Sequence, residues 1–382
     1  MKRLPRKLQT GNALSSSYRL LNHPNSPEEL AAQLADANGK AQSVTLCGNS
    51  TKDRMGGPIA PSDITISTAG LNRVLQYEPN DLTISVEAGI TYSELSRVLA
   101  EHRQMVPLDP HYADTATIGG IVATNTSGPR RRLYGSARDM VIGMTFATLE
   151  GKLIRTGGMV VKNVAGLDMG KLMIGSFGTL AAIAVVNFRL HPVPSHTRTF
   201  VQEFKGIVET IAARDAVLKN TLLPAAMDIL KTSEGYRLLI QAGGSAAVMD
   251  RYSRELPGMR AVEGPEELEL WSDIRELTPR FLDEHADGVV MRVSCKLTEV
   301  GRVLESLPVP ALARAGSGVC YGYFTGVPGP RKDRVIEFAP QQVRETAELW
   351  PVPGSDFAMM KKVKEMFDPN GLLNRNRLYG RI

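Results

Sequence analysis

The chain has 382 residues, of which 43% are hydrophobic, 22% charged and 6% aromatic. This composition is ordinary for a soluble globular protein of two or three domains, and it excludes a disordered chain, a collagen-like repeat and a coiled coil. Lysine and arginine number 45 against 40 aspartates and glutamates, and this net charge of +5 is small for the length. We therefore expect no nucleic acid among the partners.

The three cysteines, Cys47, Cys295 and Cys320, lie far apart and form no C-x-x-C pair. The chain therefore cannot supply the thiolates of an iron–sulfur cluster, and its six histidines show no metal-ligand spacing, so we expect no metal site. The basic segment 1–10 lacks the apolar stretch of a secretory signal, and no apolar run has the length of a membrane helix. We expect a cytoplasmic protein that reaches the inner membrane, if at all, peripherally and through partners.

A helix signal comes first in the chain order. Ser26 suits the N-cap, Pro27 the first helical position, and Gly39 the C-terminal stop. A short strand is predicted over 44–47, and it leads into a loop of small and polar residues at 48–52.

Alternation over 82–87 predicts a half-buried strand, and the Thr-Tyr-Ser-Glu capping box at 91–94 opens a second helix. Further strands are predicted over 141–149, 153–155 and 182–190. They complete a first, strand-rich region of the chain.

Pro192 and Pro194 end this region and mark a domain boundary. Beyond them, two β-α-β-like halves indicate a ferredoxin-like α+β unit. Its strands are predicted over 227–230, 237–241, 289–295 and 319–324, and its helices over 207–218, 245–256, 265–282 and 298–307. A last helix over 356–367 ends at a turn signal.

The most informative stretch, 116–128, is dense in glycine, threonine, serine and asparagine. Its paired glycines let a backbone approach a ligand closely, and successive N–H groups can bind a pyrophosphate. Taken alone, the stretch is equally well explained as a surface turn. The loop 48–52 and the glycine-containing segment 174–180, which leads into the next strand, favour the binding alternative.

Five ordered motifs carry a resemblance to a known family. They are T-I-S-V-E-A-G-I-T from 83, D-P-H-Y-A-D-T-A-T-I-G-G-I-V-A-T-N-T-S-G from 109, Y-G-S-A-R-D-M-V-I-G from 134, I-G-S-F-G-T-L-A-A-I from 174 and F-D-P-N-G-L-L-N from 367. The sequence resembles the FAD-binding domain of vanillyl-alcohol oxidase and p-cresol methylhydroxylase (PCMH) relatives. Within that group it is most similar to the E-type FAD-binding subunits of bacterial glycolate oxidase. The match covers about half of the chain, 18–194 and 355–382.

The resemblance implies an α+β fold with a two-subdomain PCMH-type FAD-binding domain over 1–194. A ferredoxin-like α+β cap domain would follow over 195–354, with a C-terminal return to the FAD-binding domain over 355–382. Relatives that hold FAD covalently carry His or Cys at defined loop positions, but 48–52 has no His. Cys47 is interpreted as a buried strand residue. We therefore expect non-covalent FAD.

The resemblance also assigns cofactor contacts by position. The first pyrophosphate loop would be Gly48, Asn49, Ser50, Thr51 and Lys52, and the second Ala116, Thr117, Ile118, Gly119 and Gly120. Along the flavin would lie Thr124, Asn125 and Ser127, on the adenine-side strand Ile183 and Val185, and Asn374 would return from the C-terminus to the isoalloxazine ring. Arg377 is a weaker candidate, because the family often ends differently. The run 130–132 of three arginines is interpreted as a solvated loop, with a phosphate or acidic-partner contact as the alternative.

Oxidising a 2-hydroxy acid requires a base for the hydroxyl proton and a cation for the carboxylate. Relatives that do so often carry a Glu-His-Gly-type segment, whereas here the Glu-His pairs end at His102 and His285 and are followed by Arg and Ala. His111, beside a flavin loop, is the best catalytic candidate. The alternative, that His111 is a loop histidine with no role in catalysis, is no less well supported.

In the E-type family a sister subunit also carries FAD, and a third subunit carries iron–sulfur clusters. The resemblance implies a subunit of a glycolate oxidase (glycolate dehydrogenase) complex that oxidises glycolate, a small 2-hydroxy acid, to glyoxylate and relays electrons through its flavin. We favour a relay or auxiliary duty for this flavin. A stand-alone FAD dehydrogenase of another hydroxy acid or alcohol, and a non-catalytic scaffold subunit, remain alternatives.

Overall fold

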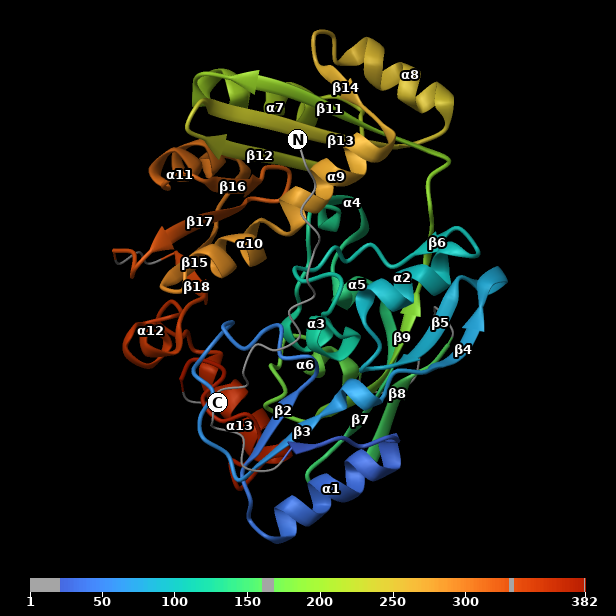
Figure 1. Cartoon of the computed structure of the whole chain (residues 1–382), viewed down its shortest axis with the longest axis vertical. Helices are drawn as coiled ribbons and strands as arrows, with labels where there is room; N and C mark the ends of the chain where they lie inside the picture. Colours follow the sequence, from blue (N-terminus) through green and yellow to red (C-terminus); the bar gives the residue numbers. More distant parts are fainter. Residues whose placement is uncertain (1–20, 160–167, 330–332, 381) are drawn as a thin grey trace, which may run out of the picture.

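The structure is a computed structural model that describes residues 21–159, 168–329, 333–380 and 382. The N-terminal segment 1–10, expected to lack a secretory signal, lies outside these ranges. Figure 1 shows two parts. The lower part carries both the first and the last described elements, and the upper part, here called the cap, is formed by residues 196–329 and 333–346. Within the described ranges, no helix has the length and apolar character needed to span a membrane.

The lower part contains a small parallel sheet and a larger antiparallel one. The small sheet has the order β1 (Leu21–Asn22), β3 (Ile64–Ser67), β2 (Val44–Cys47). The larger has the order β4 (Val74–Glu78), β5 (Thr83–Glu87), β9 (Ala182–Arg189), β7 (Val141–Ala147), β8 (Leu153–Gly157). A short pair joins β6 (Gln104–Met105) to β10 (His191–Pro192). The helices are α1 (Pro27–Gly39), α2 (Tyr92–Ala100), α3 (Ile118–Thr124), α4 (Arg131–Tyr134), α5 (Ala137–Met140) and α6 (Gly170–Met173).

Helix α1 joins the two lower sheets. Its predicted start is confirmed, because the Ser26 hydroxyl accepts a hydrogen bond from the Glu29 N–H at 3.1 Å. Leu30 and Leu34, one turn apart, are fully buried in a core that also contains residues of β2, β3, β7 and β9. This packing fixes β2, and therefore the loop that follows it.

Two predictions for the lower part are wrong. Strand β5 is buried on both faces rather than one, and its buried carboxylate, Glu87, is satisfied by the backbone N–H of Arg73 at 2.8 Å and its guanidinium at 2.7 Å. The stretch expected to be a glycine-rich loop contains helix α3. Thr117 caps this helix by accepting the Gly120 N–H at 3.2 Å, a local signal that the glycine content obscured.

The cap is built around an eight-stranded antiparallel sheet. Its order is β14 (Arg260–Val262), β11 (His196–Phe204), β13 (Gly235–Gly244), β12 (Ala226–Thr232), β16 (Ala311–Arg314), β17 (Val319–Thr325), β15 (Gly288–Ser294), β18 (Arg334–Phe338). Each half has the strand order of a ferredoxin-like unit, with its fourth strand beside its first, and the halves join where β12 pairs with β16. The predicted ferredoxin-like cap is confirmed, although β11, β14, β16 and β18 were not predicted.

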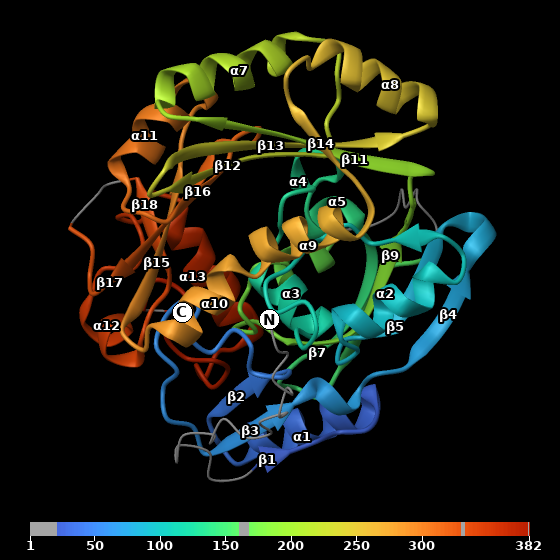
Figure 2. The ribbon, with the colours of Figure 1, turned by 45° about the horizontal axis from the view of Figure 1, so that its top comes forward.

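Helices cover both faces of the cap sheet (Figure 2). The outer face carries α7 (Ile207–Lys219), α8 (Ala246–Glu255) and α11 (Val300–Ser306). The inner face, toward the lower part, carries α9 (Gly264–Arg275) and α10 (Leu277–Glu284). Side chains on the inner face of the sheet are therefore aimed at the junction between the two parts.

The single helix predicted over 265–282 is instead divided between α9 and α10 at Glu276. Pro279 has no N–H to donate to the carbonyl four residues earlier, so the Arg275 carbonyl is left free. Nδ1 of His111, in the lower part, forms a hydrogen bond with this carbonyl at 2.9 Å. The Glu276 carboxylate accepts the N–H groups of Tyr112 and Ala113 at 3.0 and 3.1 Å. The break thus docks the cap onto the lower part.

The chain returns to the lower part after α12 (Gln341–Thr346), through α13 (Phe357–Phe367). Asp368 then turns the backbone by accepting the N–H groups of Leu372 and Leu373, each at 2.8 Å. Leu373 bridges Val44 at the start of β2. The C-terminal segment is therefore held against the strand that precedes the loop 48–52.

Candidate functional site

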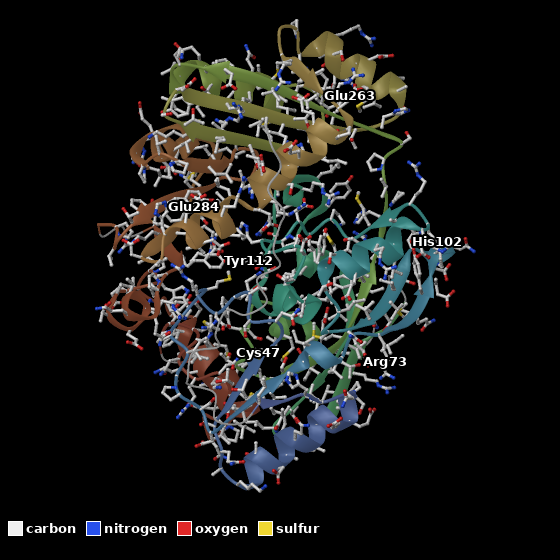
Figure 3. The ribbon with its side chains drawn as sticks, in the orientation of Figure 1. Cys47, Arg73, His102, Tyr112, Glu263 and Glu284 are labelled. Atoms are coloured by element: carbon white, nitrogen blue, oxygen red, sulfur yellow. The ribbon has the colours of Figure 1, made fainter. Side chains whose placement is uncertain are left out.

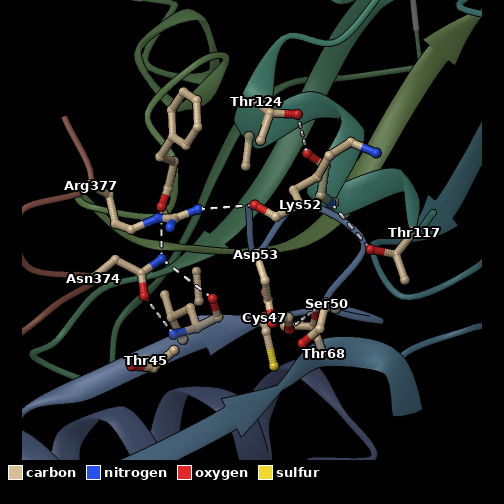
Figure 4. A pocket seen from close by; sticks show the side chains of 18 of the residues that line it. Thr45, Cys47, Ser50, Lys52, Asp53, Thr68, Thr117, Thr124, Asn374 and Arg377 are labelled. Carbon is tan, nitrogen blue, oxygen red and sulfur yellow. Dashed lines mark hydrogen bonds between the residues drawn. The ribbon is translucent and has the colours of Figure 1, made fainter. Parts of the chain in front are cut away.

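A cleft of about 920 Å³ opens where the loop 48–52 faces α3. The segment 177–183 and the C-terminal residues 374–377 complete its wall. Figure 4 shows Asn374 and Arg377 on one side of this cleft and Thr117 on the other. Four segments that are distant in sequence thus converge on one cleft.

The loop after β2 offers unpaired backbone donors. Among the residues that the structure describes, the N–H groups of Asn49, Ser50, Thr51 and Lys52 have no hydrogen-bond acceptor. The Asn49 side chain anchors the loop by donating to the Thr115 carbonyl at 2.9 Å. Consecutive free amides in a concave loop bind anionic groups such as a diphosphate.

Gly48 sets how closely this loop approaches α3. A Cβ atom at this position would lie 2.2 Å from the hydroxyl oxygen of Thr117, far inside contact distance. Gly119 is similarly constrained, because its Cβ would lie 2.9 Å from the Cβ of Ala88. Glycine is therefore required at both positions for the two walls of the cleft to stand at their observed separation.

The first turn of α3 lines the cleft, but its N–H groups are already hydrogen-bonded within the protein. The N–H groups of Ile118, Gly119 and Gly120 donate to Ile90 O, Ala88 O and Thr117 Oγ1 at 2.9, 2.6 and 3.2 Å. Thr117, Gly119 and Gly120 line the cleft, whereas Ala116 and Ile118 belong to the hydrophobic core. The unpaired amides of the cleft that could meet a diphosphate therefore come from the loop 48–52.

Lys52 is a buried cation of the cleft. Its Nζ donates to the His111 carbonyl at 3.1 Å and lies 5.0 Å from the centre of the Tyr112 ring. Burial lowers the pKa of Lys52 to about 7, although the carboxylates of Glu276 and Glu337 oppose this shift. An anion entering the cleft would favour the charged form of this side chain.

The C-terminal wall is held by backbone contacts. The Asn374 side chain accepts the Leu46 N–H at 2.7 Å and donates to the Phe177 carbonyl at 2.7 Å. Arg377 donates to Gly57 O at 2.8 Å and to Lys52 O at 3.2 Å. Both residues line the cleft and fix the loop 48–52 from behind.

Cys47 ends β2 as a half-buried residue whose side chain lines the cleft, rather than as the fully buried strand residue expected. Burial raises the pKa of its thiol to about 11, and the negative charge of Asp53 adds to this shift. The thiol therefore stays protonated at neutral pH, in its unreactive form.

A second cavity of about 1,050 Å³ adjoins the cleft and shares Thr124 and Phe177 with it. This second cavity lies between the lower part and the cap. The lower part contributes His111, Asn125, Ser127 and Arg131, and the cap contributes Arg292, Arg314, Tyr321 and Glu337. Asn125 lines the second cavity, and its buried Oδ1 is an acceptor with no partner among the described residues.

His111 is buried and lines the second cavity. Because a carbonyl only accepts, Nδ1 carries the proton toward the Arg275 carbonyl and Nε2 carries the lone pair. Burial lowers the pKa of His111 to about 3, and the cations of Lys52 and Arg314 act in the same direction. The imidazole is therefore neutral at physiological pH. In Figure 3, His102 lies at the far edge of the lower part and Glu284 in the cap, so the two Glu-His pairs do not meet.

The structure thus brings most of the sequence-predicted site residues together. Lining the cleft are Gly48, Asn49, Ser50, Thr51, Lys52, Thr117, Gly119, Gly120, Thr124, Ile183 and Asn374. Asn125, Ser127 and His111 line the second cavity. Ala116, Ile118 and Val185 line neither, because the first two face the core and Val185 packs at the end of α1.

The arginine run after α3 is not a solvated loop. Arg130 pairs with Asp109, with its Nε at 2.8 Å from a carboxylate oxygen. Arg131 lines the second cavity, and Arg132 donates to Gly316 O of the cap at 2.8 Å. The sequence analysis also missed every cap residue of the second cavity, because most of them lie in strands with no recognisable motif.

Comparison with known proteins gives three findings. The family model described as FAD binding domain matches residues 19–157. Glycolate oxidase subunit GlcE of Escherichia coli (strain K12) is 26% identical over 93% of this chain and 98% of its own length. Glycolate oxidase subunit GlcD of Bacillus subtilis (strain 168) is 31% identical over 42% of this chain, but this covers only 34% of that relative.

The solved structure of an alkyldihydroxyacetonephosphate synthase matches 93% of this chain and 75% of its own, with a TM-score of 0.67 and 18% identity. At this identity the likeness shows the fold alone, and it includes both the lower part and the cap. Free loop amides, glycine-limited walls and an unsatisfied Asn125 oxygen fit a dinucleotide with a polar ring system. Residues 19–157 match the FAD binding domain family, and the predictions of a PCMH-type fold, an FAD cofactor and an FAD-dependent oxidoreductase are confirmed.

Proposed function

We propose that the chain is the FAD-binding subunit of a glycolate oxidase complex, which oxidises glycolate to glyoxylate and passes the electrons to partner subunits. The observation that carries this proposal is the match to the GlcE subunit along 98% of that relative. The geometry supports it, since the FAD cleft opens at Thr124 and Phe177 onto a cavity that contains arginine side chains. Arginine is the side chain best suited to bind the carboxylate of a hydroxy acid.

The residues of the cleft have distinct proposed roles toward FAD. The amides of 49–52 and the ammonium of Lys52 would bind the diphosphate, and Gly48, Thr117 and Gly120 would let it approach. Ile183 would lie on the adenine side, and Thr124 and Asn125 along the flavin. When bound, FAD supplies a two-electron acceptor. The chain's own residues position this acceptor and exclude water from it.

Partners and domain bounds also belong to the proposal. A second FAD-carrying catalytic subunit and an iron–sulfur subunit would receive the electrons, since this chain has no cysteine cluster of its own. The domain bounds 1–194, 195–354 and 355–382 are supported by the start of β11 at His196 and by the contact of the C-terminal segment with β2.

One preparation tests the proposal. FAD-loaded protein, alone and with its co-purified partners, is mixed with glycolate under anaerobic conditions, and the flavin absorbance at about 450 nm is followed. We expect glycolate to bleach this band, and we expect the partners to restore it by removing electrons. After acid precipitation the flavin should remain in the supernatant, because the Cys47 thiol is protonated and the loop has no other attachment residue. An unchanged band with glycolate, both with and without partners, would contradict the proposed reaction.

A further inference from the structure

The second cavity carries the chemistry that hydroxy-acid oxidation requires, although His111 is the one residue there that the sequence suggested for that task. We propose that it binds a small 2-hydroxy carboxylate, with Arg292 as the anchor of the carboxylate and Glu337 as the catalytic acceptor of the hydroxyl proton. This inference rests on the proposed function and deepens it. It assigns substrate chemistry to this chain itself, where the relay alternative would place that chemistry in a partner.

Side chains along β15 alternate between the two faces of the sheet, and this alternation directs Arg292 toward the cavity. Met291 and Val293, its neighbours, lie in the core beneath the outer helices, so Arg292 points to the inner face. Tyr321 lies directly opposite on β17, and both side chains line the cavity. The cation of Arg292 thus enters the second cavity from a rigid strand.

The positive charge of Arg292 is poorly compensated. Its Nε lies 3.7 Å from the nearest carboxylate oxygen of Glu337, beyond hydrogen-bond distance, and among the described residues its Nη1 donates only to the hydroxyl of Ser294, at 3.3 Å. Arg314, by contrast, is held in a buried ion pair with Asp228, although its Nε has no partner within the described ranges. Of the described arginines that line the cavity, Arg131 is exposed and Arg314 is paired, so Arg292 is the one on a rigid strand without a close carboxylate partner.

Glu337 is aimed by a β-bulge. Along β18, Ile336 pairs with Met291 and Phe338 pairs with Val290, so Glu337 is the extra residue between two consecutive partners. A bulge redirects the side chain of the extra residue, and bulges recur beside active sites. The side chain of Glu337 lines the cavity, and its buried Oε2 has no hydrogen-bond partner in the part of the chain described.

The backbone holds this bulge at the edge of the FAD cleft. Gly56, four residues after Lys52, donates its N–H to the Glu337 carbonyl at 3.1 Å. Ala339 donates to the Arg54 carbonyl at 2.9 Å, and Met55 bridges Phe338. The loop that would bind the diphosphate and the carboxylate that would accept the proton are thus joined by one short antiparallel contact.

The environment of Glu337 suits a proton acceptor. Burial raises the pKa of its carboxyl, while the cations of Arg292, Lys52 and Arg314 act against this shift. A carboxylate with a raised pKa accepts a proton more readily than an exposed one, and the neighbouring Arg292 favours its ionised form.

The step balances with FAD as the oxidant. The O–H bond of the substrate breaks and its proton goes to Glu337, while the adjacent C–H hydrogen leaves with its electron pair to the bound FAD. The C–O single bond becomes C=O, so a 2-hydroxy acid yields a 2-oxo acid. Arg292 holds the carboxylate throughout and keeps the hydroxyl beside Glu337.

The test separates binding from proton transfer. Oxalate, which has no hydrogen to transfer, is titrated into FAD-loaded protein, and its Kd is read from the change in the flavin spectrum. Arg292→Gln should raise this Kd at least about tenfold. Glu337→Gln should leave the Kd within about twofold but slow flavin reduction by glycolate about 100-fold or more. The exposed residues Arg302 and Glu284 provide matched controls, R302Q and E284Q, which should behave as wild type.

FAD content and circular dichroism report folding in every variant. If Arg292→Gln does not fold, Arg292→Lys keeps the charge without the planar fork, and its oxalate Kd should still exceed that of wild type. Wild-type oxalate affinity in both Arg292 variants, or wild-type reduction rates in Glu337→Gln, would overturn the inference. If oxalate binding depends on Arg292 but glycolate does not reduce the flavin, the carboxylate site is supported. Only the proposed oxidation of glycolate would then be contradicted.

Discussion

Gly48→Ala is expected to lower the affinity of the protein for FAD by at least about 100-fold. The added Cβ would lie 2.2 Å from Thr117 Oγ1 and 2.9 Å from Thr117 Cγ2. Thr117 cannot rotate away without releasing the Gly120 N–H that it caps. The loop 48–52 must therefore move outward, which displaces its free amides and costs about 1–3 kcal/mol of overpacking.

FAD fluorescence quenching on titration of the apoprotein measures this effect. Gly39→Ala is the matched control, since a Cβ at Gly39 meets nothing within 4 Å, and this variant should bind FAD as wild type. FAD affinity of Gly48→Ala within about threefold of wild type would mean that the diphosphate does not lie between this loop and α3.

Lys52→Met is expected to stabilise the apoprotein at neutral pH while weakening FAD binding. Because burial lowers the pKa of Lys52 to about 7, holding this charge in the folded state costs on the order of 5 kcal/mol. Methionine removes this cost but loses the hydrogen bond to His111 O, so the net gain in unfolding free energy should be about 2 kcal/mol or more. The loss of a charge-assisted contact to the diphosphate should weaken FAD at least about tenfold.

The direction of the pKa shift fixes how the stability difference between Lys52→Met and wild type changes with pH. The folded-state pKa lies below that of the unfolded chain, so the burial cost is fully present below pH 7 and declines as pH rises toward about 10.5. The stability advantage of Lys52→Met should therefore be largest at pH 7 and below and should shrink at alkaline pH. Urea unfolding of the apoprotein across this range measures it. Lys362→Met, at an exposed position on α13, is the control, and equal stability of the Lys52 variant and wild type at pH 7 would contradict the account.

The FAD cleft was largely predictable because its signals are local and ordered. The strand 44–47, the small polar loop after it and the glycines at 119 and 120 are each written in a few consecutive residues. Two features there were missed. The carboxylate of Glu87 on β5 is buried in a pair with Arg73, which the alternation of the strand does not reveal, and α3 forms where glycine-rich composition favoured a loop.

The second cavity was not predictable from local signals. Arg292 belongs to a strand pattern that any half-buried strand would show, and its direction matters only once β15 has a place in the cap sheet. Glu337 is aimed by a bulge, which depends on the register between β18 and β15 rather than on residues near 337. The break at Glu276 had a local signal in Pro279, but its role in docking His111 required the folded partner.

The most direct measurement is a crystal structure of the protein with FAD and oxalate bound. The account predicts diphosphate oxygens at about 2.7–3.2 Å from the N–H groups of 49–52. It also predicts the flavin ring beside Thr124 and Asn125, and an oxalate carboxylate on Arg292 next to Glu337. A diphosphate bound outside this loop, or oxalate held away from the inner face of the cap sheet, would contradict it.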